Sequence, residues 1–161
     1  MKWHDYVSVK KGDIGERIIR EMFEKIGYII YQPITAAPHA VDFFAVKKKQ
    51  KIVAIEVKTK PRLKYYPATG FNIKSFREYQ KFQELYPRIK VFLLFVDEVL
   101  GQVYGNYLEK LAAKTVIDDN IYPKEINDVI IFPLKNMEVF RKLTQEEIAN
   151  IRSYTRSNYL P

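Results

Sequence analysis

The segment VDFFAVKKKQKIVAIEVK, residues 41–58, is the basis of the fold that we predict for this chain. Its two ends are apolar and rich in residues that favour β-strands, and the lysine-rich run at 47–51 between them is typical of a turn. We therefore predict an antiparallel hairpin with a basic tip. Antiparallel pairing brings the beginning of the first strand beside the end of the second, so Asp42 should lie close to Glu56.

The end of this hairpin carries a pattern that suits metal chemistry. Glu56 and Lys58 are two residues apart, so both point to one face of the strand, and Val57 points to the other. Two neighbouring carboxylates repel each other unless a cation binds between them. Mg²⁺ prefers oxygen ligands, and it can polarise a phosphoryl oxygen and activate water. We predict that Asp42 and Glu56 hold such a metal, and that Lys58 orients the nucleophile or neutralises charge on a phosphate. The alternative is a solvated ion pair at a strand end, with Asp42 as a turn former.

An amphipathic helix is predicted before the hairpin. Apolar residues recur at helical spacing over Ile14–Ile26, Asp13 precedes them as a candidate N-cap, and Gly27 follows as a stop. Glu16 follows Asp13 at the spacing of a capping box, which would explain it by helix-end chemistry alone. It also lies on the flank of the apolar stripe, from which it could reach the hairpin. Both interpretations of Glu16 stay open.

The remaining pattern predicts one mixed α/β domain over residues 1–161, with a central sheet flanked by helices. The other expected elements are strands at Tyr28–Gln32, Val41–Val46, Ile52–Val57, Lys90–Val96, Gln102–Tyr107 and Val129–Phe132, and helices at Ser75–Tyr86, Leu108–Lys114 and Thr144–Tyr154. Capping boxes are predicted to open the helices at Ser75 and Thr144. Pro61–Gly70 is expected to be a loop, and Arg156–Pro161 a loose tail.

Three segments resemble the motifs of the PD-(D/E)XK nuclease superfamily, which has the restriction-endonuclease-like fold. They are Gly12–Glu16 on the first helix, Val41–Phe43 on the first motif strand and Ile55–Lys58 on the next. The resemblance spans roughly residues 11–97, and Val41 stands where the motif's name has Pro. Within the superfamily, the chain is most similar to small Holliday junction resolvase-type nucleases.

This resemblance implies a role for each motif residue. Asp42 and Glu56 would be metal ligands, the Val57 carbonyl would add a third oxygen, and Lys58 would be the catalytic lysine. Glu16 matches the helical glutamate that completes the acidic cluster in many members. The implied activity is that of a DNA endonuclease that uses Mg²⁺, with Mn²⁺ as a substitute. A resolvase-type nuclease acts on branched DNA as a homodimer, because it needs two active sites.

Candidate DNA contacts follow the motif directly. They are Lys60, Arg62, Lys64, Tyr65 and Tyr66. The basic groups could bind phosphate, and the tyrosines could stack on exposed bases. His39 could contact phosphate or help in proton transfer, and Gln80 lies on the helix where several nuclease families place a polar residue. Each of these residues also has a plain interpretation as a solvated side chain. The lysine tip at 47–51 is expected to be a solvated turn, because it lies at the far end of the hairpin.

Composition narrows the class of protein. The net charge of +8, from 27 Lys and Arg against 19 Asp and Glu, favours a polyanionic partner such as DNA. The absence of cysteine excludes disulfides and thiolate metal sites. No signal peptide is found and the longest apolar run, Val91–Val96, is too short to cross a bilayer, so we expect a cytoplasmic protein without membrane contact. Two alternatives stay open: a noncatalytic nucleic-acid-binding module, and an accessory subunit of a larger defence or repair complex.

Overall fold

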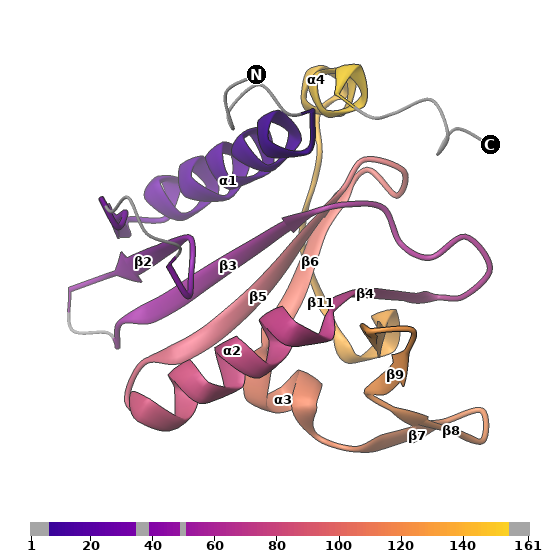
Figure 1. The fold of residues 1–161 in the computed structure, drawn as a ribbon. Helices are drawn as coiled ribbons and strands as arrows, with labels where there is room; N and C mark the ends of the chain where they lie inside the picture. The colour runs from indigo at the N-terminus through magenta and orange to yellow at the C-terminus, as the bar shows by residue number, and fades with distance from the viewer. Residues whose placement is uncertain (1–6, 35–38, 49–50, 155–161) are drawn as a thin grey trace.

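A six-stranded sheet with the order β1-β2-β3-β5-β6-β11 organises the chain (Figure 1). The computed structural model describes residues 7–34, 39–48 and 51–154. The strands are β1 (Ile29–Tyr31), β2 (Phe43–Val46), β3 (Val53–Thr59), β5 (Lys90–Asp97), β6 (Gln102–Tyr107) and β11 (Glu138–Lys142). β3 and β5 run parallel, and the other neighbours run antiparallel. The predicted mixed central sheet is therefore confirmed.

Helices cover both faces of this sheet (Figure 1). They are α1 (Val7–Lys25) and α4 (Gln145–Ser153) on one face, and α2 (Ile73–Leu85) and α3 (Leu108–Ala112) on the other. Ile55 and Val57 of β3 join the core under α1, whereas Ala54 joins the core under α2. Because both faces are covered, the apolar run Val91–Val96 in β5 is buried throughout. Among the described residues, no helix has both the length and the apolar composition needed to cross a membrane.

Two smaller sheets lie outside the central sheet, and of their strands the sequence analysis predicted only the one at Val129–Phe132. The three-stranded sheet has the order β4 (Ala68–Asn72), β10 (Val129–Pro133) and β9 (Lys124–Ile126), and the two-stranded sheet pairs β7 (Thr115–Ile117) with β8 (Asn120–Tyr122). A short 3₁₀ helix, η2 (Leu134–Asn136), precedes β11. The predicted loop at Pro61–Gly70 is wrong at its end, because β4 begins at Ala68 and pairs with β10. Such a pairing joins segments far apart in the sequence, so no local pattern reveals it.

The start of α1 differs from the prediction. The helix is already formed at Val7, so Asp13 lies inside it and is not its N-cap. The explanation of Glu16 as half of a capping box is therefore wrong. The additional turns are anchored by tertiary contact, since the Lys11 ammonium lies 2.5 Å from the buried carboxylate of Glu98. The end of the helix is confirmed, because Gly27 follows it with a φ of 89°.

Of the two predicted capping boxes, one is confirmed and one is wrong. Thr144 and Glu147 cap α4 reciprocally. Helix α2, however, begins at Ile73, and the side chain of Asn72 caps it by accepting a hydrogen bond from the Lys74 N–H at 2.8 Å. Ser75 therefore lies within the first turn. The other predicted helices and strands are confirmed to within two residues at their ends. The predicted tail at Arg156–Pro161 lies outside the described residues.

The close approach of α1 to β3 requires a residue without a side chain at Gly15. A Cβ atom there would lie 1.7 Å from the Oγ1 of Thr59. On the same helix, a Cβ at Gly12 would meet nothing within 4 Å. The two glycines thus form a matched pair, in which packing requires a glycine at position 15 but not at position 12.

We expect Gly15→Ala to lower the free energy of unfolding by about 1–3 kcal/mol, because it overpacks the contact between α1 and β3. Gly12→Ala should instead raise it by up to about 1 kcal/mol, through helix propensity alone. Urea denaturation of the two variants and the wild type measures both changes. Combining Gly15→Ala with Thr59→Ala should recover most of the loss. Equal effects of the two glycine substitutions would contradict this account of the packing.

Candidate active site

The hairpin places Asp42 against the end of β3. The Asp42 N–H donates to the Ile55 carbonyl at 3.0 Å, which extends the antiparallel pairing of β2 and β3 by one residue. The Oδ2 atom of Asp42 then accepts a hydrogen bond from the Val57 N–H at 2.7 Å. The predicted approach of the two hairpin ends is thus observed, and the carboxylate is held by a backbone donor rather than by a flexible side chain.

Glu56 and Lys58 lie on the same face of β3, beneath α2. Glu56 is only 5% exposed, and its Oε1 atom accepts a hydrogen bond from the Lys58 ammonium at 2.6 Å. The side chain of Lys58 is 25% exposed, so the ammonium can still reach a ligand. This is not a solvated ion pair at a strand end, because the carboxylate is shielded from water.

The carbonyl of Val57 points to the side of β3 on which Asp42 lies. The N–H and C=O of one strand residue point the same way, and the Val57 N–H donates to Asp42. The ladder between β2 and β3 stops at the pair Phe43 and Ile55, two residues before this carbonyl. A backbone oxygen is thus placed beside the carboxylate of Asp42.

Glu16 approaches from the opposite face of the sheet, on α1. It lines a cleft of about 350 Å³ together with Asp13, Gln32, His39 and Asp42. Burial raises the pKa of Glu16, and the negative charges of Asp13 and Glu56 raise it further. Because Glu16 does not cap α1, its carboxylate is free of a helix-end role and faces this cleft.

The carboxylates of the site repel one another. Burial raises the pKa of Asp42 to about 8, and the negative charges of Glu56 and Glu16 contribute to the shift. The hydrogen bond from Val57 and the positive charge of Lys58 oppose this shift only in part. An acid with such a pKa is partly protonated at neutral pH, unless a cation favours its charged form.

The donors present fit a hard divalent cation. Asp42, Glu56 and the Val57 carbonyl offer oxygen atoms only, and Mg²⁺ is commonly held by one or two carboxylates with water completing its shell. Over residues 7–34, 39–48 and 51–154, no three His, Cys, Asp or Glu side chains lie close enough to hold a metal by themselves. Glu16 therefore does not close a three-carboxylate cluster in this arrangement, and its role as a ligand stays a prediction.

His39 lies at the mouth of the site, where it lines the cleft. Its Nδ1 atom lies 2.6 Å from the carbonyl oxygen of Val41. A carbonyl can only accept, so Nδ1 carries the proton and donates it. The ring thereby braces the turn that leads into Asp42. A phosphate contact of His39 through its other nitrogen stays a prediction.

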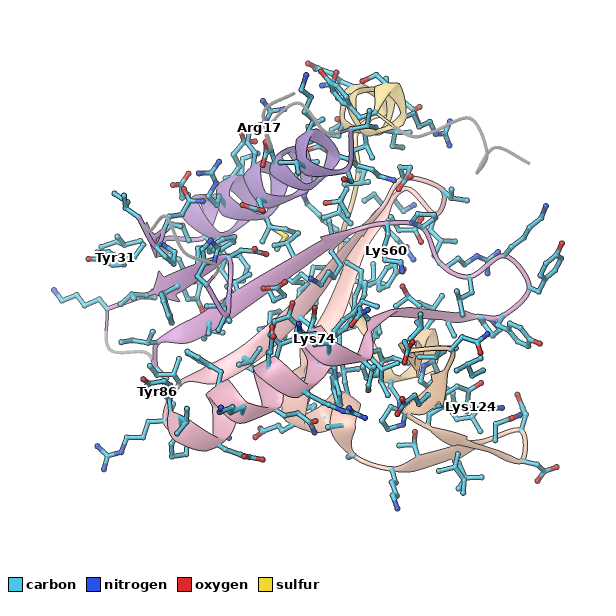
Figure 2. The ribbon with its side chains drawn as sticks, viewed as in Figure 1. Arg17, Tyr31, Lys60, Lys74, Tyr86 and Lys124 are labelled. Atoms are coloured by element: carbon cyan, nitrogen blue, oxygen red, sulfur yellow. The ribbon has the colours of Figure 1, made fainter. Side chains whose placement is uncertain are left out.

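The predicted basic residues after Lys58 do not behave alike. The Lys60 ammonium donates to the Gly70 carbonyl, and burial, followed by the charges of Lys58 and Lys11, lowers its pKa. Figure 2 shows Lys60 close to the sheet near the end of β3. Lys60 is thus engaged within the protein, which weakens its case as a phosphate contact.

The exposed part of this loop begins two residues later. The Arg62 N–H donates to buried Asp97 at 2.8 Å, which anchors the loop at its start. The side chains beyond this anchor face solvent: Tyr65 is 81% exposed and Tyr66 is 64% exposed. The Lys64 ammonium lies 5.7 Å from the centre of the Tyr65 ring. The side chains that stay predicted DNA contacts of the loop are those of Arg62, Lys64, Tyr65 and Tyr66.

Helix α2 brings a residue to the site that the sequence analysis did not name. The hydroxyl of Tyr79 contacts both Glu56 and Lys58, whereas its neighbour Gln80 is half-buried and its role stays a prediction. Tyr79 follows Phe76 at helical spacing, so it counts as part of the apolar stripe. Only the packing of α2 beneath β3 reveals that its hydroxyl reaches the carboxylate.

Comparison with known proteins identifies the fold. No family model matches the chain, and no curated protein matches it in sequence. The structure is similar to that of Hjc, a Holliday junction resolvase from the archaeal hyperthermophile Archaeoglobus fulgidus, with a TM-score of 0.54. The two share 13% sequence identity, over 78% of this chain and 86% of that chain. The chain has a restriction-endonuclease-like fold.

The restriction-endonuclease-like fold is the one that the motif residues implied. At this sequence identity the likeness concerns the fold alone. The roles of Asp42, Glu56 and Lys58 therefore rest on their geometry, and the implied metal stays a prediction.

We expect metal-free wild-type protein to lose stability as the pH rises from about 4 to about 8. The pKa of Asp42 is about 8 in the folded protein, well above that of an unfolded chain, so the folded state binds the extra proton in this window. Asp42→Asn keeps an acceptor for the Val57 N–H but removes the charge. The variant should be more stable than the wild type by roughly 2–5 kcal/mol at pH 8, and by much less at pH 5. Urea denaturation in EDTA measures both values. A difference independent of pH would contradict the repulsion described above.

Proposed function

We propose that this protein is a metal-dependent DNA endonuclease that hydrolyses phosphodiester bonds. The observation that carries the proposal is the convergence of Asp42, Glu56 and Lys58 at one end of the hairpin. Two partly buried carboxylates repel each other unless a cation binds to them, and the raised pKa of Asp42 reflects that repulsion and the burial. The adjacent Lys58 ammonium suits an anionic substrate. The restriction-endonuclease-like fold supports the same proposal.

The residues would divide the chemistry between them. Asp42, Glu56 and the Val57 carbonyl would hold Mg²⁺, which supplies Lewis-acid polarisation of the phosphate and an acidified water. The Lys58 ammonium would donate a hydrogen bond to a phosphate oxygen or orient the attacking water. Glu16, across the cleft, would bind the metal through a water molecule or help to place the nucleophile.

DNA is the substrate that the charge distribution favours. The chain carries a net charge of +8, and the loop after β3 presents Arg62 and Lys64 beside two exposed tyrosines. Basic groups bind the phosphate backbone, and aromatic rings stack on bases that are not paired. A Holliday junction, which is a branched DNA, is the substrate in the name of the structural neighbour. A four-way junction needs two symmetric cuts, so the proposal includes a homodimer on that substrate.

We expect the purified protein to cleave four-way junction DNA in Mg²⁺ or Mn²⁺, and to cleave duplex and single strands more slowly. Glu56→Gln should reduce the rate by about 100-fold or more, because a metal ligand contributes at least as much as the groups that orient it. Labelled substrates separated on denaturing gels give the rates. Glu84→Gln, an exposed glutamate on α2, is the matched control and should cleave like the wild type.

Equal cleavage by wild type and Glu56→Gln would contradict the assignment of the site. Tight binding of DNA without cleavage of any substrate would instead favour a noncatalytic binding module.

The loop after β3 yields a second prediction. Substituting both Arg62 and Lys64 by Ala should weaken DNA binding and reduce the slope of log affinity against log salt by about 2, since each phosphate contact contributes about 0.9. Binding measured in Ca²⁺ by fluorescence anisotropy over a range of salt gives the slope. Lys48→Ala, on the exposed tip of the hairpin, is the control and should change the slope little. An effect at Lys48 as large as that at the loop would place the DNA track elsewhere.

A further inference from the structure

We propose that Tyr79 is a positioning residue for the cleavage reaction, acting through Lys58; the inference rests on the proposed function. Tyr79 lies on α2, the helix that covers the face of β3 carrying Glu56 and Lys58. It comes from a separate element and bears none of the motif chemistry. Its hydroxyl is nevertheless the point at which α2 meets both functional side chains.

The three groups form a closed triangle of hydrogen bonds. The Tyr79 hydroxyl donates to Oε1 of Glu56 at 2.5 Å and accepts from the Lys58 ammonium at 2.9 Å. The same ammonium donates to the same Oε1 atom at 2.6 Å. A carboxylate can only accept and an ammonium can only donate, so the hydroxyl must do one of each. The directions of all three bonds are therefore determined.

The environment keeps the hydroxyl in its bridging state. Tyr79 is only 4% exposed, so water does not compete for its hydrogen bonds. Burial and the negative charge of Glu56 raise the pKa of Tyr79, and the hydroxyl retains its proton. The ring is held in turn by Phe71, whose ring centre lies 5.7 Å away. The hydroxyl is thus a rigid support rather than a mobile donor.

A lysine needs such a support more than most side chains. Its ammonium sits on a flexible four-carbon stem and loses considerable rotamer freedom when it is fixed. The rings of Phe71 and Tyr79 flank the ammonium at 5.4 Å each. Two of its three N–H donors are directed at Glu56 and Tyr79, so the third is left to meet a phosphate oxygen or a water.

The triangle also orients Glu56. Its Oε1 atom accepts from both Lys58 and Tyr79, and Glu56 would help to hold the cation with its carboxylate fixed in this orientation. Without the hydroxyl, Lys58 and Glu56 would still pair, but their side chains could change rotamer together. We therefore expect loss of the hydroxyl to slow the chemical step rather than to weaken DNA binding.

Tyr104 provides a matched control for a merely structural role. It is a second buried tyrosine of the same core, only 1% exposed, and its hydroxyl donates to buried Asp97 at 3.1 Å. Tyr104→Phe removes the same atom from a comparable environment that does not touch Glu56 or Lys58. Because Asp97 also anchors the loop after β3, this variant could change KM for DNA, and the comparison is therefore made on kcat. Both substitutions should lower the melting temperature, because each leaves a buried carboxylate with one donor fewer.

The experiment compares Tyr79→Phe and Tyr104→Phe in steady-state cleavage of junction DNA at saturating Mg²⁺. We expect Tyr79→Phe to reduce kcat by about 10–100-fold with KM for DNA unchanged, as is typical for residues that orient a metal ligand or catalytic group. Tyr104→Phe should keep the wild-type kcat. An equal loss of kcat in both variants, or no loss in Tyr79→Phe, would overturn the inference.

A double-variant cycle tests whether Tyr79 acts through Lys58. In single-turnover reactions with excess enzyme, adding Tyr79→Phe to Lys58→Met should slow cleavage little beyond Lys58→Met alone. Independent, multiplicative losses would overturn the proposed route. A wild-type protein that cleaves no DNA in Mg²⁺ or Mn²⁺ would overturn the proposed function and this inference together. An active wild type with an unaffected Tyr79→Phe variant would overturn this inference alone.

Discussion

The hydrogen bond from the Val57 N–H to the Asp42 carboxylate is the interaction on which the rest of the site depends. It joins the start of β2 to the end of β3 and brings two acids together where the chain would otherwise keep them apart. The same bond stabilises the charged form of Asp42, yet burial and the charges of Glu56 and Glu16 outweigh it. The hairpin thus holds a carboxylate in an unfavourable state, which is a common feature of functional sites.

The site is assembled at one strand because β3 is buried on both faces. Alternate residues of β3 point toward α1 and toward α2, so each helix can bring a side chain to the same short segment. Glu16 comes from α1 and lines the cleft beside Asp42. Tyr79 comes from α2 and braces Lys58 against its carboxylate partner. A strand with only one covered face could not gather both contributions.

Much of the fold follows from local patterns. The helical stop at Gly27, the capping box at Thr144 and the apolar run at Val91–Val96 all involve neighbouring residues, and all are found as predicted. Predictions failed where a distant contact prevailed over a local signal. The Lys11 pair with Glu98 anchors α1 before its expected start, and β4 exists only because β10 pairs with it.

The hairpin and the closeness of Asp42 to Glu56 could be predicted from local sequence, because strand alternation and antiparallel pairing act over a few residues. Local sequence also indicated Lys58, on the same face as Glu56. Which helix side chains reach these residues depends on how the helices pack on the sheet, and local sequence does not show that. A helical pattern shows which face is buried but not what that face touches, so no role for Tyr79 was predicted. Its hydroxyl acquires a role because α2 packs over β3.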